Sequence, residues 1–113
     1  MSDTVFSKIL SGEIPIEFLH EDVSCVAFND IAPQAPVHIV VIPRHPYRNV
    51  AEASEKDPAL VGHLIAVCSK LARQQQLENG FRIVTNQGDE GGQSVDHLHF
   101  HLLGGRAMQW PPG

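Results

Sequence analysis

The sequence contains little cysteine, no long hydrophobic run and no cluster of basic residues. Its only two cysteines, Cys25 and Cys68, are far apart and form no Cys-x-x-Cys motif, so we expect reduced, buried thiols. No apolar stretch is long enough to span a bilayer. The N-terminus lacks the basic and apolar regions of a signal peptide. These absences predict a cytoplasmic protein with neither a disulfide framework nor a membrane partner.

The charge balance also excludes a class of partners. Thirteen acidic residues face eight basic ones, which gives a net charge of -5 with the seven histidines neutral. Nucleic-acid-binding proteins usually carry a basic patch, so we expect no nucleic-acid partner. The length of 113 residues fits a single domain over residues 1–113. A chain this short buries a thin core, which favours oligomerisation as a further source of burial.

The hydrophobic pattern predicts strands mixed with one long helix. Asp57 suits the N-cap and Pro58 the first position of that helix, and Asn79-Gly80 suits its C-terminus. A shorter helix is expected over residues 4–10. Strands are expected over residues 16–20, 24–28, 37–42, 81–86 and 95–103. Short connections between such elements indicate an α+β fold with a mostly antiparallel sheet.

The last of these strands carries an alternating pattern of histidines and apolar residues. His97, His99 and His101 occupy odd positions, whereas Leu98, Phe100 and Leu102 occupy even ones. Because side chains of a strand alternate between its two faces, the imidazoles should line one face and the apolar side chains should pack under the long helix. Asp96 should point away from the histidine row.

Three interpretations of the histidine row compete. The histidines could merely satisfy hydrogen bonds on a half-buried strand. They could hold a metal ion, but neighbours on one face are about 6.6–6.8 Å apart, so one zinc ion could hardly take all three. A pair joined by His38 or His63 would remain. The third interpretation is nucleophilic catalysis, in which the middle imidazole attacks phosphorus and its neighbours orient it.

The surroundings of the row favour catalysis. A neutral imidazole is a competent nucleophile near pH 7, and its phosphorylated form contains a P–N bond, as a phosphoramidate does. Gly88, Gly91 and Gly92 precede the strand and would let backbone N–H groups approach an oxyanion closely. The hydroxyl of Ser94 could contact a phosphate oxygen or the leaving group.

At these residues the sequence resembles a known family. Residues 91–103, GGQSVDHLHFHLL, are similar to the His-φ-His-φ-His-φ-φ signature of the histidine-triad (HIT) superfamily, where φ is apolar. The tail 104–113, GGRAMQWPPG, and residues 28–38, FNDIAPQAPVH, resemble the Hint branch of histidine-triad nucleotide-binding proteins. The resemblance extends from Thr4 to Gly113.

The resemblance implies both a fold and an activity. The fold would be HIT-like, with a five-stranded antiparallel sheet and two helices, and two protomers would join into a ten-stranded sheet. The activity would be that of a purine nucleoside phosphoramidase, which hydrolyses adenosine 5'-phosphoramidate and related P–N bonds, and acyl-adenylates as a further class, to AMP through a covalent nucleotidyl-histidine. No metal and no cofactor would be needed.

The resemblance also assigns catalytic roles. His99 matches the family nucleophile, and His101 matches the histidine that contacts the phosphate. His97 and His38 match the pair that orients and tunes the nucleophile. Ser94 matches the serine at the phosphate and leaving group.

The nucleotide site implied by the resemblance draws on several parts of the chain. Asp30 matches the carboxylate that accepts from the ribose hydroxyls, and Asn86 matches a polar phosphate contact. Asn29 stands where relatives often have histidine, and Asp96 where many have an aromatic residue. The remaining nucleotide-binding positions are Phe6, Ile9, Phe28, Ile31, Val40, Gly92, Gln93 and Val95.

Trp110 and two rival functions complete the expectations. A lone tryptophan in a proline-rich tail would leave a large apolar ring exposed to solvent, so we expect Trp110 to pack on the partner protomer of a homodimer. One rival function is a dinucleoside polyphosphate hydrolase of the Fhit branch, which shares the nucleophile but differs in the tail. The other is a purine nucleotide-binding or scaffold module without catalysis.

Overall fold

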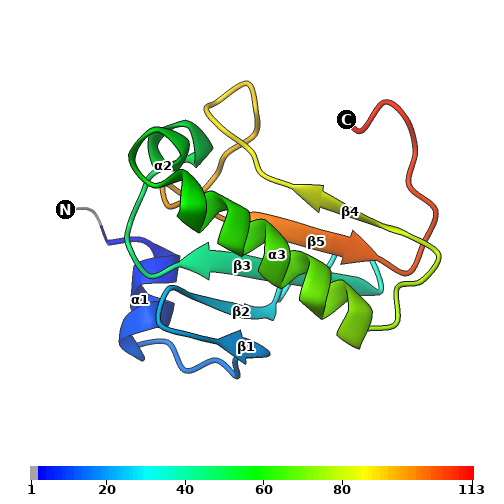
Figure 1. Ribbon diagram of the computed structural model, residues 1–113, viewed down its shortest axis with the longest axis horizontal. Helices are drawn as coiled ribbons and strands as arrows, with labels where there is room; N and C mark the ends of the chain where they lie inside the picture. The colour runs from blue at the N-terminus through cyan, green and yellow to red at the C-terminus, as the bar shows by residue number, and fades with distance from the viewer. Residues whose placement is uncertain (1–2) are drawn as a thin grey trace.

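Five antiparallel strands form one sheet in the computed structural model, which describes residues 3–113 (Figure 1). The strand order is β1-β2-β3-β5-β4, and every neighbouring pair is antiparallel. In chain order the elements are α1 (Val5–Ser11), β1 (His20–Glu21), β2 (Cys25–Asn29), β3 (Val37–Pro43), α2 (Val50–Lys56), α3 (Pro58–Gln74), β4 (Phe81–Val84) and β5 (Phe100–Gly104). The expected α+β fold with a five-stranded antiparallel sheet is confirmed.

Local sequence signals determine where the two main helices begin. The Thr4 side chain accepts from the backbone N–H of Ser7, and the Ser7 hydroxyl oxygen accepts from the N–H of Thr4, which is a reciprocal capping box. Asp57 caps α3, with Pro58 at its first position, as predicted. However, α3 ends at Gln74, earlier than the expected end at Asn79-Gly80.

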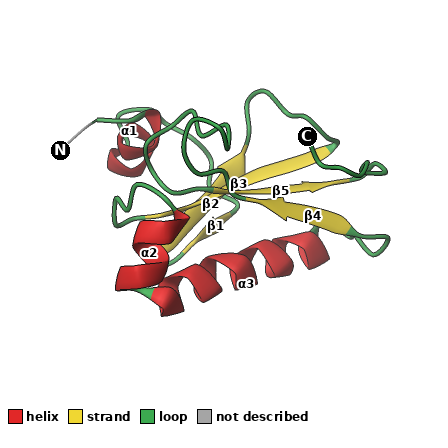
Figure 2. Ribbon diagram, turned by 90° about the horizontal axis from the view of Figure 1, so that it is seen from above, coloured by secondary structure: helices red, strands yellow, loops and turns green. Residues whose placement is uncertain are grey.

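The sheet separates two hydrophobic clusters. Figure 2 shows α2 and α3 on one side of the sheet and α1 on the other. Leu98, Phe100 and Leu102 belong to the cluster under α3, as the alternation predicted. Phe6 and Ile9 of α1 form the second cluster with side chains on the opposite face. The histidine side of the last strand therefore faces α1.

Several predicted boundaries are wrong. The strand expected over residues 95–103 begins only at Phe100, because the N–H of Leu98 donates to the carbonyl of Tyr47, 2.7 Å away, instead of joining the β3 ladder. The strand expected over 16–20 is reduced to the two residues of β1, and β4 ends at Val84, two residues before the expected Asn86.

Two features of the helices differ from the sequence-based expectation. The structure has an additional helix, α2, whose sequence VAEASEK contains too few large apolar residues for a clear periodicity. The spacing of apolar residues in α3 would place Ile65 on one stripe with Leu64 and Cys68, yet Ile65 is 43% exposed, whereas Leu64 and Cys68 are fully buried. Both cysteines are free and buried, as expected. Of the described helices, none combines the length and the apolar character needed to cross a bilayer.

Replacing Leu102 by alanine should test the packing of β5 under α3. Leu102 is 0% exposed, so Leu102→Ala should lower the free energy of unfolding by about 2–5 kcal/mol through a lost apolar contact and a residual cavity. Urea denaturation would measure the change. Val23→Ala is the control, because Val23 is 94% exposed and should change stability by less than about 0.5 kcal/mol. Equal effects of the two substitutions would contradict the assigned core.

Candidate active site

The three histidines of the row lie at and just before the start of β5. His97 and His99 are buried in the segment that leads into the strand, and His101 is the second residue of β5. The Phe6 ring of α1 stands edge-on to both of the buried imidazoles, with centroids 5.9 Å from His97 and 4.9 Å from His99. His99 and His101 are themselves 5.0 Å apart. Helix α1 therefore closes one side of a compact imidazole cluster.

Backbone contacts determine which nitrogen of His99 carries its proton. Its Nδ1 lies 2.7 Å from the carbonyl oxygen of His97, and a carbonyl oxygen only accepts hydrogen bonds. Nδ1 is therefore the protonated nitrogen, and Nε2 keeps its lone pair when the ring is neutral. The Thr85 hydroxyl donates to the carbonyl of His99 over 2.8 Å and so fixes the main chain at this residue. Nε2 is thereby available as a nucleophile.

A second chain of hydrogen bonds orients His101. The backbone N–H of Gln34 donates to Nδ1 of His38 over 3.0 Å, so a neutral His38 carries its proton on Nε2. That Nε2 lies 2.9 Å from Nδ1 of His101 and 3.5 Å from Oδ2 of Asp30. His101 thus accepts at Nδ1 and presents its Nε2–H as a free donor. This arrangement suits contact with a phosphate oxygen.

His97 orients the ring of His99 through its main-chain carbonyl. Its Nε2–H donates to the carbonyl of Pro43 over 2.9 Å, which anchors the ring to the end of β3. Its own carbonyl is the group that accepts from His99. The expected supporting pair is thus divided, with His97 next to His99 and His38 next to His101.

Burial keeps the whole row uncharged near neutral pH. Desolvation lowers the pKa of His97 and His99 below the ordinary 6.5 and outweighs the hydrogen bonds that favour the charged forms. For His101, burial first and then the charges of His99 and His38 lower the pKa to about 4. A neutral imidazole is the form that can attack an electrophile.

The apolar residues expected around the base are only partly brought together. Phe6, Ile9, Phe28 and Val40 form one buried cluster, and Val95 packs against it. Ile31 is 92% exposed and does not join this cluster, because it lies in the irregular connection after β2.

The polar residues expected around the nucleotide lie at the end of β2 and after β4. Asn29 is exposed, and Asp30 is half-buried with its Oδ1 accepting from the N–H of Ala32. Asn86 is also half-buried. Asp30 is the only one of the three in hydrogen-bonding or ion-pair contact with the imidazole cluster, through His38.

The glycine-rich loop before β5 is shaped by close contacts and by Gln93. Gly92 has a positive φ of 81°, and a Cβ on Gly91 would lie 2.2 Å from the carbonyl oxygen of Gln87. The Gln93 amide donates to the carbonyls of Arg48 and Val95 and accepts from the N–H of Gly88. Gln93, expected to contact the nucleotide, therefore holds the loop with its side chain. Ser94 is exposed next to it.

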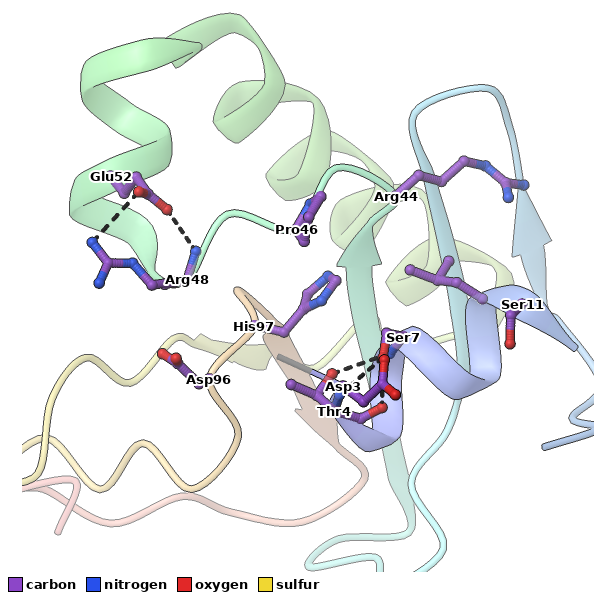
Figure 3. Close-up of a pocket in the computed structure, with 11 residues that line it drawn as sticks. Asp3, Thr4, Ser7, Ser11, Arg44, Pro46, Arg48, Glu52, Asp96 and His97 are labelled. Atoms are coloured by element: carbon purple, nitrogen blue, oxygen red, sulfur yellow. Dashed lines mark hydrogen bonds and ion pairs between the residues drawn. The ribbon is translucent and has the colours of Figure 1, made fainter. Parts of the chain in front are cut away.

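A cavity of about 550 Å³ opens beside His97 (Figure 3). It lies between α1 and the segment that leads into α2, and Arg48 and Glu52 form an ion pair at its edge. Of the predicted catalytic and nucleotide-binding residues, His97 is the only one that lines this cavity. Asp96, expected to point away from the row, lines it too, because residues 95–97 form a bend and not a strand. Ser94 lines a separate depression of about 350 Å³.

The C-terminal tail is held at its base and exposed at Trp110. Arg82 donates to the carbonyl of Gln109 over 2.8 Å, and Arg106 donates to the carbonyl of Gln34 over 3.1 Å. Trp110 is 84% exposed in the single chain. The tail therefore carries a large aromatic surface away from its own core.

Several contributors to the site were not expected from the sequence. Thr85, Gln34, Pro43 and Tyr47 act through a hydroxyl or through main-chain groups. Main-chain groups are nearly the same in every residue type, so no sequence signal could have identified Gln34, Pro43 and Tyr47. Thr85 follows a predicted apolar strand as a lone hydroxyl residue, which is a weak signal.

Comparisons with known proteins agree with this geometry. The HIT domain model matches residues 11–108. An uncharacterized HIT-like protein of Synechococcus elongatus is 53% identical over 111 residues, which cover 98% of this chain and 97% of the relative. A 14 kDa zinc-binding protein of Zea mays is 47% identical over 99% of this chain and 89% of its own length. The crystal structure of a HIT family hydrolase from Legionella pneumophila superposes with a TM-score of 0.93 at 43% identity, covering 98% and 100% of the two chains.

The buried histidines should make stability depend on pH in the acid range. The unfolded chain takes up protons at histidine as the pH falls through 6.5, whereas the folded chain resists protonation of His101 until about pH 4. The free energy of unfolding should therefore be highest above pH 6.5 and fall progressively towards pH 4. Urea denaturation at a series of pH values measures the slope.

His101→Asn should flatten that slope, because asparagine does not titrate yet offers an acceptor to His38. The control is Val23→Ala, which replaces an exposed side chain that does not titrate and should leave the slope unchanged. An identical slope in the wild type and in His101→Asn would show that the row does not resist protonation.

Proposed function

The chain belongs to the HIT domain family, and from this premise we propose that it is a purine nucleoside phosphoramidase. HIT family proteins bind nucleotide substrates, and a structural neighbour with a nearly identical fold is named a hydrolase. Membership of this family therefore supports a role in hydrolysing or binding nucleotides. The specific reaction we propose is cleavage of the P–N bond of adenosine 5'-phosphoramidate and related compounds to AMP.

The observation that carries the proposal is the protonation pattern of His99. Its Nδ1–H is committed to the carbonyl of His97, and burial keeps the ring neutral, so Nε2 offers a lone pair at pH 7. In the proposed first step, Nε2 forms a bond to phosphorus and the bond from phosphorus to the amine breaks. The amine takes a proton from solvent through the exposed Ser94 hydroxyl. Water then bonds to phosphorus, the bond from phosphorus to Nε2 breaks and one water proton returns to solvent, which releases AMP and restores neutral His99.

The neighbours of His99 supply charge stabilisation and binding. The Nε2–H of His101 would donate to a phosphoryl oxygen, where negative charge grows as the nucleophile attacks. The N–H groups of Gly92 and Gln93 do not add to this, because they already donate to the carbonyls of Asp89 and Gly88 within the loop. Asp30 would accept from the ribose hydroxyls, and the base would lie against the cluster that contains Phe6 and Phe28.

Zinc needs a separate test, because the maize relative is named for binding it. Asp30, His38 and His101 place one ligand atom each within 4.8 Å of one another. The proposed nucleophile, His99, is not one of these three residues, and its neutral Nε2 can attack phosphorus without a metal ion. We therefore propose a metal-independent reaction.

Substitution of the nucleophile should abolish turnover. His99→Ala should lower the rate of AMP release from adenosine 5'-phosphoramidate by more than about a thousandfold, since no other group can form the covalent intermediate. A chelator should leave the wild-type rate unchanged. Rapid acid-free quenching and mass spectrometry should find AMP attached to His99 in the wild type.

His45→Gln is the matched control, because it removes an exposed imidazole and should keep full activity. Faster turnover of diadenosine polyphosphates than of the phosphoramidate would favour the dinucleoside polyphosphate hydrolase instead. AMP binding without turnover would favour a binding module, and loss of activity to the chelator would contradict the metal-independent reaction.

We also propose a homodimer in which Trp110 reaches the partner protomer near the leaving-group side. Its 84% exposure in one chain leaves an aromatic ring free to pack there. Trp110→Ala should shift the ratio of kcat/KM between small and bulky leaving amines by roughly tenfold, about 1.4 kcal/mol, while the urea midpoint stays unchanged. Identical ratios in the wild type and the variant would contradict this role.

A further inference from the structure

A second group of histidines lies on the opposite face of the sheet. His20, Asp22, Cys25 and His63 each direct one ligand atom into a space where all four atoms lie within 4.8 Å of one another. We refer to these four residues as the α3-side cluster. Nε2 of His20 and Nε2 of His63 are both 2.7 Å from Oδ2 of Asp22, and Sγ of Cys25 is 3.6 Å from the same oxygen.

Three separate parts of the fold contribute to this cluster. His20 and Asp22 come from β1 and the turn that follows it, Cys25 begins β2, and His63 reaches across from α3. Cys25 belongs to the hydrophobic cluster under α3, whereas Phe6, which contacts His97 and His99, belongs to the cluster under α1. The α3-side cluster is therefore separated from the proposed catalytic histidines by the sheet.

We propose that the α3-side cluster is a zinc-type metal site, with the two imidazoles, the thiolate and the carboxylate as its four ligands. This proposal goes beyond the proposed function and does not depend on it. Two nitrogens, one sulfur and one oxygen are the ligand types that Zn²⁺ takes in four-coordinate sites. Ligand bonds of about 2.0–2.3 Å need ligand atoms about 3.3–3.8 Å apart, so the 2.7 Å contacts must lengthen slightly.

The hydrogen bonds, charges and solvent access of the α3-side cluster fit a metal site. Oδ1 of Asp22 accepts from the N–H groups of Ser24 and Cys25, at 2.7 and 2.8 Å, which leaves Oδ2 to face the other three ligand atoms. Such contacts outside the ligand shell orient a ligating carboxylate. A divalent ion would also be neutralised by the single charges of the Asp22 carboxylate and the Cys25 thiolate. His63 is 43% exposed, so the ion could enter from solvent on that side.

Binding would rearrange protons in a defined way. Without metal, both Nε2 atoms face an oxygen that only accepts, so each carries a proton. On binding, each neutral ring would shift that proton to Nδ1, and the Cys25 thiol would release one proton to solvent. Lys70 Nζ, now 3.4 Å from Nδ1 of His20, would have to move away. Lys70→Met should therefore bind metal more tightly than the wild type.

Cobalt titration of the full-length, metal-free protein tests the site directly. Co²⁺ should bind with one-to-one stoichiometry and give a thiolate-to-cobalt charge-transfer band together with the visible bands of a tetrahedral ion. Zn²⁺ should displace it, and the midpoint of thermal unfolding should rise because the ion joins α3 to the β1–β2 hairpin. His63→Gln should weaken binding by at least about tenfold.

Matched variants distinguish cobalt bound at the α3-side cluster from cobalt bound elsewhere on the chain. Cys25→Ser should lose the charge-transfer band, whereas Cys68→Ala and His45→Gln, which alter a cysteine and a histidine outside the cluster, should keep it. Cobalt binding without a thiolate band would place the ion elsewhere, as at Asp30, His38 and His101, and would overturn the proposal. Absence of saturable binding would overturn it too, whatever the outcome of the phosphoramidate assay.

Discussion

The register between β3 and β5 is the constraint on which the rest of the site depends. Val40 lies opposite His101 and His38 lies opposite Leu103, so the two imidazoles are diagonal neighbours on the same face. Their rings come within 2.9 Å, and this contact determines which nitrogen of His101 is free to donate. A slip of one residue would move His101 to the face under α3 and bring Leu102 to the α1 face. The apolar packing under α3 therefore also determines the orientation of the histidine row.

The sheet divides the molecule into two sides with different chemistry. The cluster under α3 contains most of the large buried aliphatic side chains, which make the register costly to change. The cluster under α1 is smaller and ends at Phe6, whose ring contacts the imidazoles. This proximity helps to bury His97 and His99, and burial in turn keeps both rings uncharged. The packing of α1 is thus directly connected to the protonation state that a nucleophile requires.

Backbone carbonyls and N–H groups orient the imidazoles more than other side chains do. Pro43 and His97 accept through their carbonyls, and Gln34 donates through its N–H. In the part of the chain that the structure describes, no buried side-chain nitrogen or oxygen lacks a hydrogen-bond partner. Because main-chain groups of β3 and its flanking segments are fixed by the sheet, the imidazoles are held before any substrate binds. Such preorganisation lowers the reorganisation needed during a reaction.

The sequence by itself determined the fold class, the N-terminal cap of α3 and the two faces of the last strand. Alternation of His97, His99 and His101 with apolar residues was sufficient, because side-chain direction in an extended chain follows from backbone geometry alone. The boundaries of that strand could not be predicted, since the N–H of Leu98 bonds to Tyr47, a residue distant in sequence. The exposure of Ile31 was not predicted either, because it depends on the path of the irregular connection after β2.

Only the tertiary structure decided how protons are distributed and which distant residues meet. The roles of Gln34 and Pro43 depend on main-chain groups that every sequence carries, so residue type could not reveal them. The meeting of Asp22 with His63 is similar, because it depends on how α3 lies across the sheet and not on any spacing in the chain. The sequence pattern specifies the face of the sheet or helix on which a side chain lies. The distance between side chains from two different elements depends on how those elements pack.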